Sequence, residues 1–400
     1  MNERNNRKLW QIGSGGLNPL VEKYTVGDDY VFDQKLLPYD IQASIAHAQM
    51  LKKIGVLSAP ELRNLKKGLK EILALWKAGK FLILPEQEDG HTAIEQFLTE
   101  QYGEVGKKIH TGRSRNDQAL VMLRLYMKEQ LGKVRSLTSV LANVYKVRAK
   151  QLDIPMPGYT HMQKAMPTKV ATWLESYELA FKEIVPLLQS SMHLIDQNPL
   201  GSASGFGIRN LRVDRVYTTK KLEFKRVQKN PMHCGLSRGY FEFLAMQPMS
   251  NLMVLAAKFA SDMMLFTTQE FAFFSLPHDF TTGSSIMPQK RNYDVFEVMR
   301  ANSKVFSGFH DQIRDIAASL GSGYHRDYQV TKRSLILGVE LCIATLEILN
   351  EIVTKLEVNK FNLEKAMTAD LFVTEDVYAL VDQGMNFRDA YLRVKKQLRT

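Results

Sequence analysis

The central part of the chain carries hydrophobic residues at intervals of three or four positions over unusually long stretches. Residues 118–154 contain no proline and one glycine. Their apolar side chains form one stripe, made of Leu120, Leu123, Met127, Leu131, Val134, Leu137, Leu141 and Val144. This spacing matches the turn of an α-helix rather than the alternation of a strand. The pattern therefore predicts a single helix of about 50 Å, since each helical residue adds about 1.5 Å.

The same pattern predicts four more long helices, over residues 170–188, 252–274, 295–320 and 332–356. Segments rich in Gly, Pro and Ser separate them, and runs that alternate like strands are nearly absent. We therefore expect an all-α protein built around a bundle of five long helices. These helices are apolar on more than one face, which predicts that they also pack against helices of other subunits.

Shorter helical patterns flank the predicted bundle. They indicate helices over residues 40–51 and 61–75 and a few small helices near the C-terminus. We expect an N-terminal helical domain over residues 1–111, which contributes substrate contacts. A central long-helix domain over 112–361 would carry the catalytic loops and the oligomer core, and a short C-terminal helical domain would cover 362–400.

The composition is that of an ordinary globular protein with an excess of positive charge. The 400 residues include 53 Lys and Arg against 42 Asp and Glu, a formal net charge of +11. The densest basic run, residues 209–229, has little aromatic interleaving. A solvated surface is the favoured interpretation, and an anion-facing role is the alternative. A nucleic-acid binder would rest on net charge alone and would show steeply salt-dependent binding to any duplex.

Several features favour a cytoplasmic protein. Two cysteines, Cys234 and Cys342, are too few for a disulfide framework and have no zinc-site spacing. The first residues are polar and lead into no apolar segment, so we expect no signal peptide. The most apolar stretch, residues 252–276, contains a lysine and two acidic residues, which argues against a membrane span.

Two loop segments before predicted helices carry cations and a titratable group. Segment 110–118 contains two arginines beside a helix start that Asn116 or Asp117 would cap, and such a terminus favours anions. Segment 156–168 contains His161, which titrates near neutral pH. Taken alone, each segment is most simply a polar loop.

Two further loop segments offer hydrogen-bond donors. Segment 281–292 has hydroxyl groups, backbone amides and the cation of Lys290, which suit a carboxylate or a developing oxyanion. Segment 322–332 contains three possible carboxylate donors, Tyr324, Gln329 and Lys332. The four loops together supply Ser and His for proton transfer and cations and amides for carboxylates. This set predicts acid–base chemistry on a polyanionic substrate, with no metal and no cofactor.

Three of these segments resemble the signature regions of the argininosuccinate lyase family, a branch of the fumarase/aspartase superfamily. They are HTGRSRNDQ (110–118), MPGYTHMQKAMPT (156–168) and TTGSSIMPQKRN (281–292). Similarity extends over nearly the whole chain, through FDQKL (32–36), GHTAIE (90–95), NPLGSASGFG (198–207) and NFRDAY (386–391). The resemblance implies a three-domain all-α fold, a homotetramer with a 20-helix core, and active sites that each gather residues from three subunits.

The resemblance also implies a reaction. Such enzymes cleave argininosuccinate reversibly into arginine and fumarate, the last step of arginine biosynthesis, by an anti elimination. Ser284 and His161 would be the proton-transfer residues, and Glu297 would orient His161. We favour Ser284 as the base, made more acidic by loop amides and Lys290, with His161 or water as the acid. The opposite assignment stays open.

By resemblance, the substrate-binding positions lie in several parts of the chain. They are Asp29, Ser114, Arg115, Asn116, Thr160, Asn292, Tyr324, Gln329 and Lys332, with His91 as a weaker candidate. At position 29 the family usually has a serine that contacts substrate. An aspartate there would either repel a substrate carboxylate or hold a guanidinium.

Other departures from the family pattern affect less specific positions. Residues 10–14 differ from the usual WGGRF opening, and residues 230–239 replace the NSxDxVSDRD segment. Tyr293 replaces a proline, and Val330 and Thr331 replace an acidic pair. Relatives often continue for about 50 residues beyond NFRDAY, so we expect a curtailed third domain.

Two other functions remain open at this point. Another fumarate-releasing C–N lyase of the superfamily, acting on a different succinyl-amine, is favoured by the changes at Asp29 and 230–239. A non-catalytic protein on the lyase scaffold would assemble but release no fumarate. Product analysis with several succinyl-amines separates these alternatives.

Overall fold

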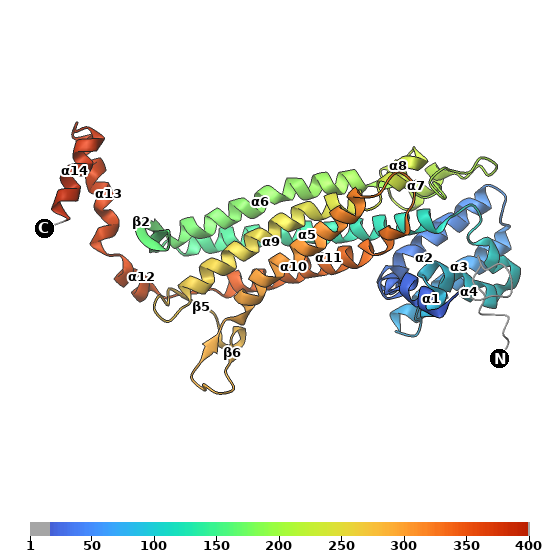
Figure 1. The fold of residues 1–400 in the computed structure, drawn as a ribbon, viewed down its shortest axis with the longest axis horizontal. Coiled ribbons are helices and arrows are strands. Elements are labelled where there is room, and N and C mark those ends of the chain that lie inside the picture. Colours follow the sequence, from blue (N-terminus) through green and yellow to red (C-terminus); the bar gives the residue numbers. More distant parts are fainter. Residues whose placement is uncertain (1–16, 399–400) are drawn as a thin grey trace. The chain divides into compact units, whose positions relative to one another are not determined.

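The computed structural model describes residues 17–398 and is built mainly of helices (Figure 1). The long helices are α5 (Arg115–Gln151), α6 (Val170–Ile195), α9 (Tyr240–Phe266), α10 (Asp294–Ala318) and α11 (Thr331–Lys355). The predicted all-α class and its five long helices are therefore confirmed. Residues 10–14, with their departure from the family opening, lie outside the described residues.

The chain forms two compact units. Among the described residues, the first unit comprises 17–133, 187–250 and 306–341, and the second comprises 134–186, 251–305 and 342–398. Each long helix begins in one unit and ends in the other. The division into an N-terminal, a central and a C-terminal domain stays a prediction.

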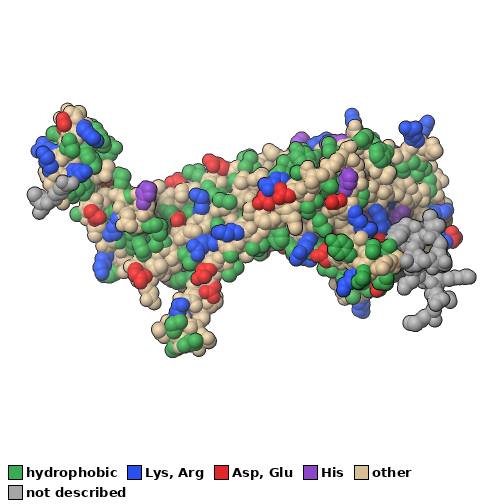
Figure 2. Space-filling view, viewed as in Figure 1, with side chains coloured by type: hydrophobic (Ala, Val, Ile, Leu, Met, Phe, Trp, Pro, Cys, Tyr) green, Lys and Arg blue, Asp and Glu red, His purple; other side chains and the backbone are tan. Residues whose placement is uncertain are grey.

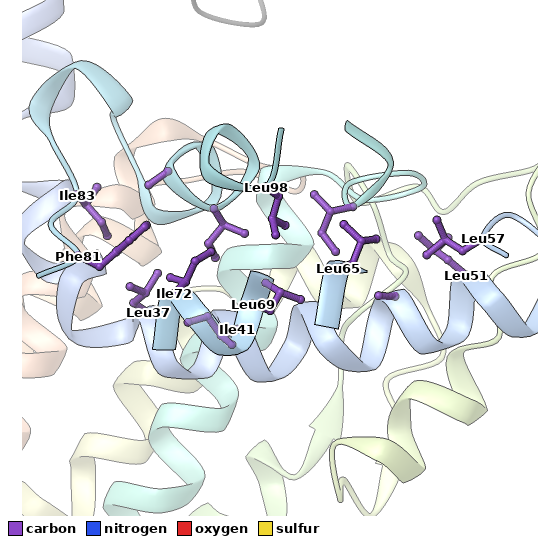
Figure 3. Packing of buried hydrophobic residues seen from close by; sticks show 14 of the residues in the cluster. Leu37, Ile41, Leu51, Leu57, Leu65, Leu69, Ile72, Phe81, Ile83 and Leu98 are labelled. Atoms are coloured by element: carbon purple, nitrogen blue, oxygen red, sulfur yellow. The ribbon is translucent and has the colours of Figure 1, made fainter. Parts of the chain in front are cut away.

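The N-terminal part of the first unit is a small helical core. Its helices are α1 (Pro19–Val26), α2 (Asp29–Lys53), α3 (Ala59–Lys77) and α4 (Gly90–Tyr102), with 3₁₀ turns at Pro85–Gln87 and Gly103–Lys108. Figure 3 shows the apolar side chains of α2 and α3, including Leu37, Ile41, Leu65 and Leu69, packed together with Leu98 of α4. Ser58 begins α3 through a capping box with Glu61, which satisfies backbone donors at this helix start.

Helix α2 is much longer than the predicted helix over 40–51. It begins at Asp29 and continues through Pro38. Its buried residues include the carboxylates Asp29, Asp33 and Asp40 as well as apolar side chains. The hydrophobic pattern breaks at these acidic positions, which explains why the sequence underestimated the length of the helix.

Besides the ends of the long helices, the rest of the first unit consists of short elements and a 3₁₀ turn. They are β3 (Gln197–Asn198), which pairs in parallel with β4 (Arg226–Val227), helices α7 (Arg215–Lys221) and α8 (Pro231–Leu236), and η5 (Arg326–Gln329). Part of the basic run thus has a structural role. The Arg215 side chain donates to the backbone carbonyls of Asn198, Leu200 and Gln228.

Aromatic side chains hold α5, α6 and α9 together in the second unit. Tyr145 stacks on Tyr177 and Phe181, with 5.7 Å between ring centroids in both pairs. Trp173 and Tyr177 both donate hydrogen bonds to the Asp262 carboxylate, at 2.9 and 2.8 Å. Asp262, one of the two acidic residues within the apolar stretch 252–276, is therefore paired inside the second unit.

Helix α9 differs from its predicted bounds of 252–274. It begins at Tyr240 and ends at Phe266, where the chain turns back and the Phe273 amide donates to the Phe266 carbonyl at 2.9 Å. Phe274 then enters β5 (Phe274–Ser275), which pairs with β8 (Glu357–Val358). By length and composition α9 could cross a membrane, a property shared by the buried core helices of soluble proteins.

The second unit also carries two hairpins and the C-terminal helices. β1 (Pro155–Thr160) pairs with β2 (Gln163–Lys169), and β6 (Thr282–Gly283) pairs with β7 (Arg291–Asn292). A 3₁₀ turn lies at His278–Phe280. The chain then ends in α12 (Lys360–Ala366), η6 (Ala369–Phe372), α13 (Val373–Asp382) and α14 (Phe387–Gln397), which agree with the expected small helices.

Apolar side chains also lie on the outside of the long helices, as Figure 2 shows for one face. Those in the second unit are Val140, Val147, Leu179, Val254, Val298, Val305 and Ile348. Exposed apolar side chains of this kind are what the sequence-based prediction of packing against helices of other subunits requires.

Candidate active site

The predicted site residues fall into two groups, one in each unit. In the first unit a cavity of about 170 Å³ is lined by several of them, namely Asp29, Arg115, Asn116, Tyr324, Gln329 and Lys332. Glu88, Asp89 and His91 also line this cavity. In the second unit Thr160, His161, Ser284, Lys290 and Asn292 lie on the two hairpins, and Glu297 lies on α10.

Lys332, near the start of α11, is held by two carboxylates of α2. Its Nζ lies 2.9 Å from Asp29 and 2.6 Å from Asp33, and all three side chains are at least nine-tenths buried. Burial lowers the pKa of Lys332, but the two carboxylates outweigh it and the pKa is raised. Burial raises the pKa of Asp29 to about 6, against the opposing effect of the Lys332 ammonium. Asp29 is thus already paired within the protein.

Arg115, in the first turn of α5, is also engaged by acidic residues. Its guanidinium lies 3.0 Å from Glu88 and 3.3 Å from Asp89, and it donates to the Thr92 hydroxyl at 2.8 Å. Asp89 also caps α4 by accepting the Thr92 backbone amide. Neither Glu88 nor Asp89 was predicted from the sequence as a neighbour of this arginine.

His91 is oriented by a carboxylate on α2. Its Nδ1 lies 2.6 Å from Asp40 Oδ2, and both residues are buried. Burial lowers the pKa of His91, but the Asp40 carboxylate outweighs it and raises the pKa. The sequence contained a signal for these acidic partners, because Asp29, Asp33 and Asp40 are spaced to share one face of a helix.

The start of α5 differs from the predicted cap. The helix begins at Arg115, so Asn116 and Asp117 lie in its first turn and Ser114 precedes it. The Ser114 hydroxyl accepts the Asn116 amide at 3.3 Å, and Asp117 accepts the Ser114 amide at 2.9 Å. Asp117 also accepts the amides of Gly201 and Ala203, which ties this helix start to the glycine-rich segment. Asp117 therefore does not act as the N-cap of α5. Its buried carboxylate accepts three backbone amides instead.

The segment predicted as a loop around His161 is instead the β1–β2 hairpin. Its strands pair from Pro155 opposite Lys169 to Thr160 opposite Gln163. His161 and Met162 form the turn, with φ of 52° and 62°. Two consecutive residues in the left-handed region are typical of a tight hairpin turn, although neither is glycine. The turn presents both His161 and Thr160 to solvent.

The loop between β6 and β7 presents Ser284. Its hydroxyl oxygen accepts the backbone amides of Ile286 at 3.3 Å and Met287 at 3.1 Å. Asn292 pairs with Thr282 across the hairpin, and Lys290 lies in the exposed loop. Two amide donors at the serine oxygen would stabilise negative charge on it.

Glu297, in the first turn of α10, is exposed. Within residues 17–398, no hydrogen bond or ion pair joins Glu297 to His161 or Ser284 to His161. The same described range contains no group of three or more His, Cys, Asp or Glu side chains placed to hold a metal ion. Within one chain, the predicted proton-transfer residues Ser284 and His161 are therefore not joined to each other, and Glu297 is not joined to His161.

Comparison with known proteins places this chain in a family. A family model described as a lyase matches residues 18–308. The chain is 41% identical over 391 residues to the argininosuccinate lyase of Thermotoga neapolitana, with 98% of each chain covered. It is 41% identical over 384 residues to that of Stenotrophomonas maltophilia, covering 96% of this chain and 89% of the relative. The chain belongs to the argininosuccinate lyase family.

Solved structures of other enzymes share the fold of this chain. An EDDS lyase in complex with formate superposes with a TM-score of 0.81 at 23% identity, covering 96% of this chain and 76% of that one. A class II fumarase from Schistosoma mansoni gives 0.73 at 17% identity, covering 94% and 91%. These structures show the fold alone. The family resemblance seen in the sequence is confirmed by the family model and by the two argininosuccinate lyases above, while the roles of individual residues stay predictions.

Proposed function

We propose that this protein is an argininosuccinate lyase, which cleaves L-argininosuccinate reversibly into L-arginine and fumarate. The observation that carries the proposal is identity of 40–41% over nearly the full length to several argininosuccinate lyases. The Ser284 loop supports it, because its geometry suits proton abstraction next to a carboxylate.

In the proposed mechanism Ser284 is the base. The reaction removes a proton from the carbon beside a carboxylate, and the developing aci-carboxylate needs preorganised donors. The amides of Ile286 and Met287 would hold Ser284 as an alkoxide, and Lys290 would add positive charge. We assign Asn292, Thr160 and the residues of the first-unit cavity to substrate binding.

We assign the acid to His161, which protonates the departing guanidinium nitrogen, with Glu297 as the carboxylate that orients it. Since these two residues are exposed and unconnected within one chain, we propose that they meet across subunits. The exposed apolar residues of the long helices would be buried in a homotetramer with a 20-helix core. We further propose that the enzyme is cytoplasmic and completes arginine biosynthesis without a cofactor.

The direct test is fumarate formation by the purified protein. We expect the ultraviolet absorbance of fumarate to rise when argininosuccinate is added, and arginine to appear in equal amount. A well-folded oligomer that releases fumarate only from another succinyl-amine would establish the alternative lyase. That alternative is favoured by one observation, the carboxylate at Asp29. An oligomer that releases no fumarate from any succinyl-amine would contradict both.

Subunit mixing tests the proposal that active sites are shared. His161→Asn and Ser284→Ala subunits are each expected to be inactive, but a mixed oligomer would contain some sites with both intact residues. We expect fumarate release to recover to a measurable fraction of the wild-type value after subunit exchange. Exchange is verified with a mass-tagged subunit. Absence of recovery in verified mixed oligomers would show that each chain supplies both residues to its own site.

A further inference from the structure

A second cavity of the first unit lies between the starts of α9 and η5 and the end of α10. Its volume is about 370 Å³, and it shares no lining residue with the cavity around Asp29. Most of its wall is apolar or aromatic, and the side chains on it include Tyr240, Phe243, Ala317, Ala318 and Tyr328. A cavity with this size and lining suits a small organic ligand better than a single ion.

Arg238 lines this cavity with a guanidinium that is buried and only partly satisfied. Its Nη2 donates to the Tyr328 backbone carbonyl at 3.3 Å, whereas Nη1 and Nε have no hydrogen-bond partner among residues 17–398. Nε lies 3.6 Å from Glu242 Oε1, which is beyond hydrogen-bond distance. A buried charged donor without an acceptor costs free energy, so this position suits a ligand that accepts.

The buried charges around Arg238 leave an excess of positive charge. Arg124 is a second buried guanidinium. Burial lowers the pKa of Arg124 to about 10, the Glu242 carboxylate opposes this shift, and the Arg238 charge adds to it. These two buried arginines therefore share one buried carboxylate. Arg314, the other arginine of the cavity wall, already pairs with two aspartates of α10.

The residues on either side of Arg238 account for this excess. Ser237 and Gly239 stand where the segment NSxDxVSDRD has aspartates. The Ser237 hydroxyl accepts a hydrogen bond from Arg124 Nη2 at 2.6 Å but supplies no charge. Gly239 has a φ of 72°, and a Cβ there would lie 3.1 Å from the Tyr328 ring. This chain thus keeps the arginine and lacks both neighbouring carboxylates.

We propose that this cavity binds a small carboxylate with an apolar or aromatic body. The ligand carboxylate would accept a hydrogen bond from Arg238 Nη1 and supply the missing negative charge. Its body would pack against Phe243, Tyr328 and the neighbouring apolar wall. The inference goes beyond the proposed lyase function and does not depend on it.

The lining disfavours other ligand classes. An inorganic anion would satisfy Arg238 but would leave the apolar wall of the cavity in contact with water. A neutral apolar ligand would cover that wall but leave Nη1 without an acceptor. A carboxylate with an apolar body satisfies both parts of the cavity.

The experiment titrates the full-length protein with phenylpropionate and with its neutral amide, phenylpropionamide, by calorimetry. The two probes share one apolar body and differ in the charge of the group that would face Arg238. We expect the wild type to bind the carboxylate about tenfold to a hundredfold more tightly than the amide, the range for hydrogen bonds to a charged group. Arg238→Met should remove this preference. Saturating fumarate should not displace phenylpropionate, because fumarate has no apolar body.

A cavity-filling variant tests the site without changing a buried charge. Ala318→Phe adds a ring to the cavity wall from an exposed position of α10, so both probes should bind more weakly. The matched control is Ser319→Phe, which adds the same ring at the next exposed residue, outside the cavity lining, and should leave binding unchanged. Circular dichroism verifies that each variant is folded.

Four results would overturn the inference. They are the absence of saturable phenylpropionate binding to the wild type, an unchanged preference for the carboxylate in folded Arg238→Met, displacement of phenylpropionate by fumarate, and unchanged binding in Ala318→Phe. If Arg238→Met does not fold, Ala318→Phe and the fumarate competition decide the result. Since no turnover is measured, failure of this inference leaves the lyase function untouched.

Discussion

Replacing Ser284 with alanine is expected to lower the turnover of argininosuccinate at least about a hundredfold. Alanine removes the oxygen that accepts the amides of Ile286 and Met287 and that would take the substrate proton. Because this interaction is needed mainly in the transition state, the loss should fall on kcat while KM changes little. Steady-state measurement of fumarate release separates the two parameters.

The control for this prediction is Gln289→Ala in the same exposed loop, which has no assigned role and is expected to retain activity. Circular dichroism and the size of the oligomer should be the same for both variants. Near-normal turnover of Ser284→Ala would remove this serine from the mechanism and move the base to His161 or to water.

Replacing Lys332 with methionine is expected to have the largest effect on stability. The change leaves the buried carboxylates Asp29 and Asp33 without their ammonium partner. Removing one partner of a buried ion pair typically costs about 3–5 kcal/mol. We expect a lower midpoint of thermal unfolding at pH 8, and loss of substrate binding in the cavity.

The pH dependence of this loss gives a specific check. The pKa of Asp29 is already raised to about 6, and without the ammonium it should rise further. A group whose folded-state pKa lies above its unfolded value makes the folded state relatively more stable as pH falls. The variant should therefore approach the wild-type stability between pH 8 and pH 5.

A second substitution shows whether the carboxylates cause the loss. Adding Asp33→Asn to Lys332→Met should recover part of the stability at pH 8, because one buried negative charge is removed. Equal destabilisation at pH 5 and pH 8, with no recovery in the double variant, would mean that Lys332 acts through packing instead.

Much of the fold could be predicted because its signals are local. The stripe from Leu120 to Val144 lies within α5, and α10 and α11 begin within one residue of their predicted starts. Helical periodicity reports the burial of one face within a continuous segment. The prediction was wrong where that signal failed, at the acidic start of α2 and at the end of α9, where Phe273 and Phe274 leave the helix.

The β1–β2 hairpin was missed for a related reason. Its strands contain Pro155, Pro157 and Pro167 with Gly158 between them, and such residues indicate a loop when the partner strand is unknown. The hairpin exists because the two segments pair across a tight turn. That pairing brings His161 to the tip, which the sequence had only placed in a polar loop.

The sequence by itself determined the helical class and the family, and its motifs named several of the residues that line the cavity of the first unit. Motifs carry this information because each signature segment keeps its residues together in the chain. Only the tertiary structure decided the state of Asp29, which lies 303 residues from Lys332 in sequence and contacts it directly. The charge and the proton affinity of a buried carboxylate depend on neighbours from other elements and on the exclusion of water, and neither can be obtained from the local pattern of residues.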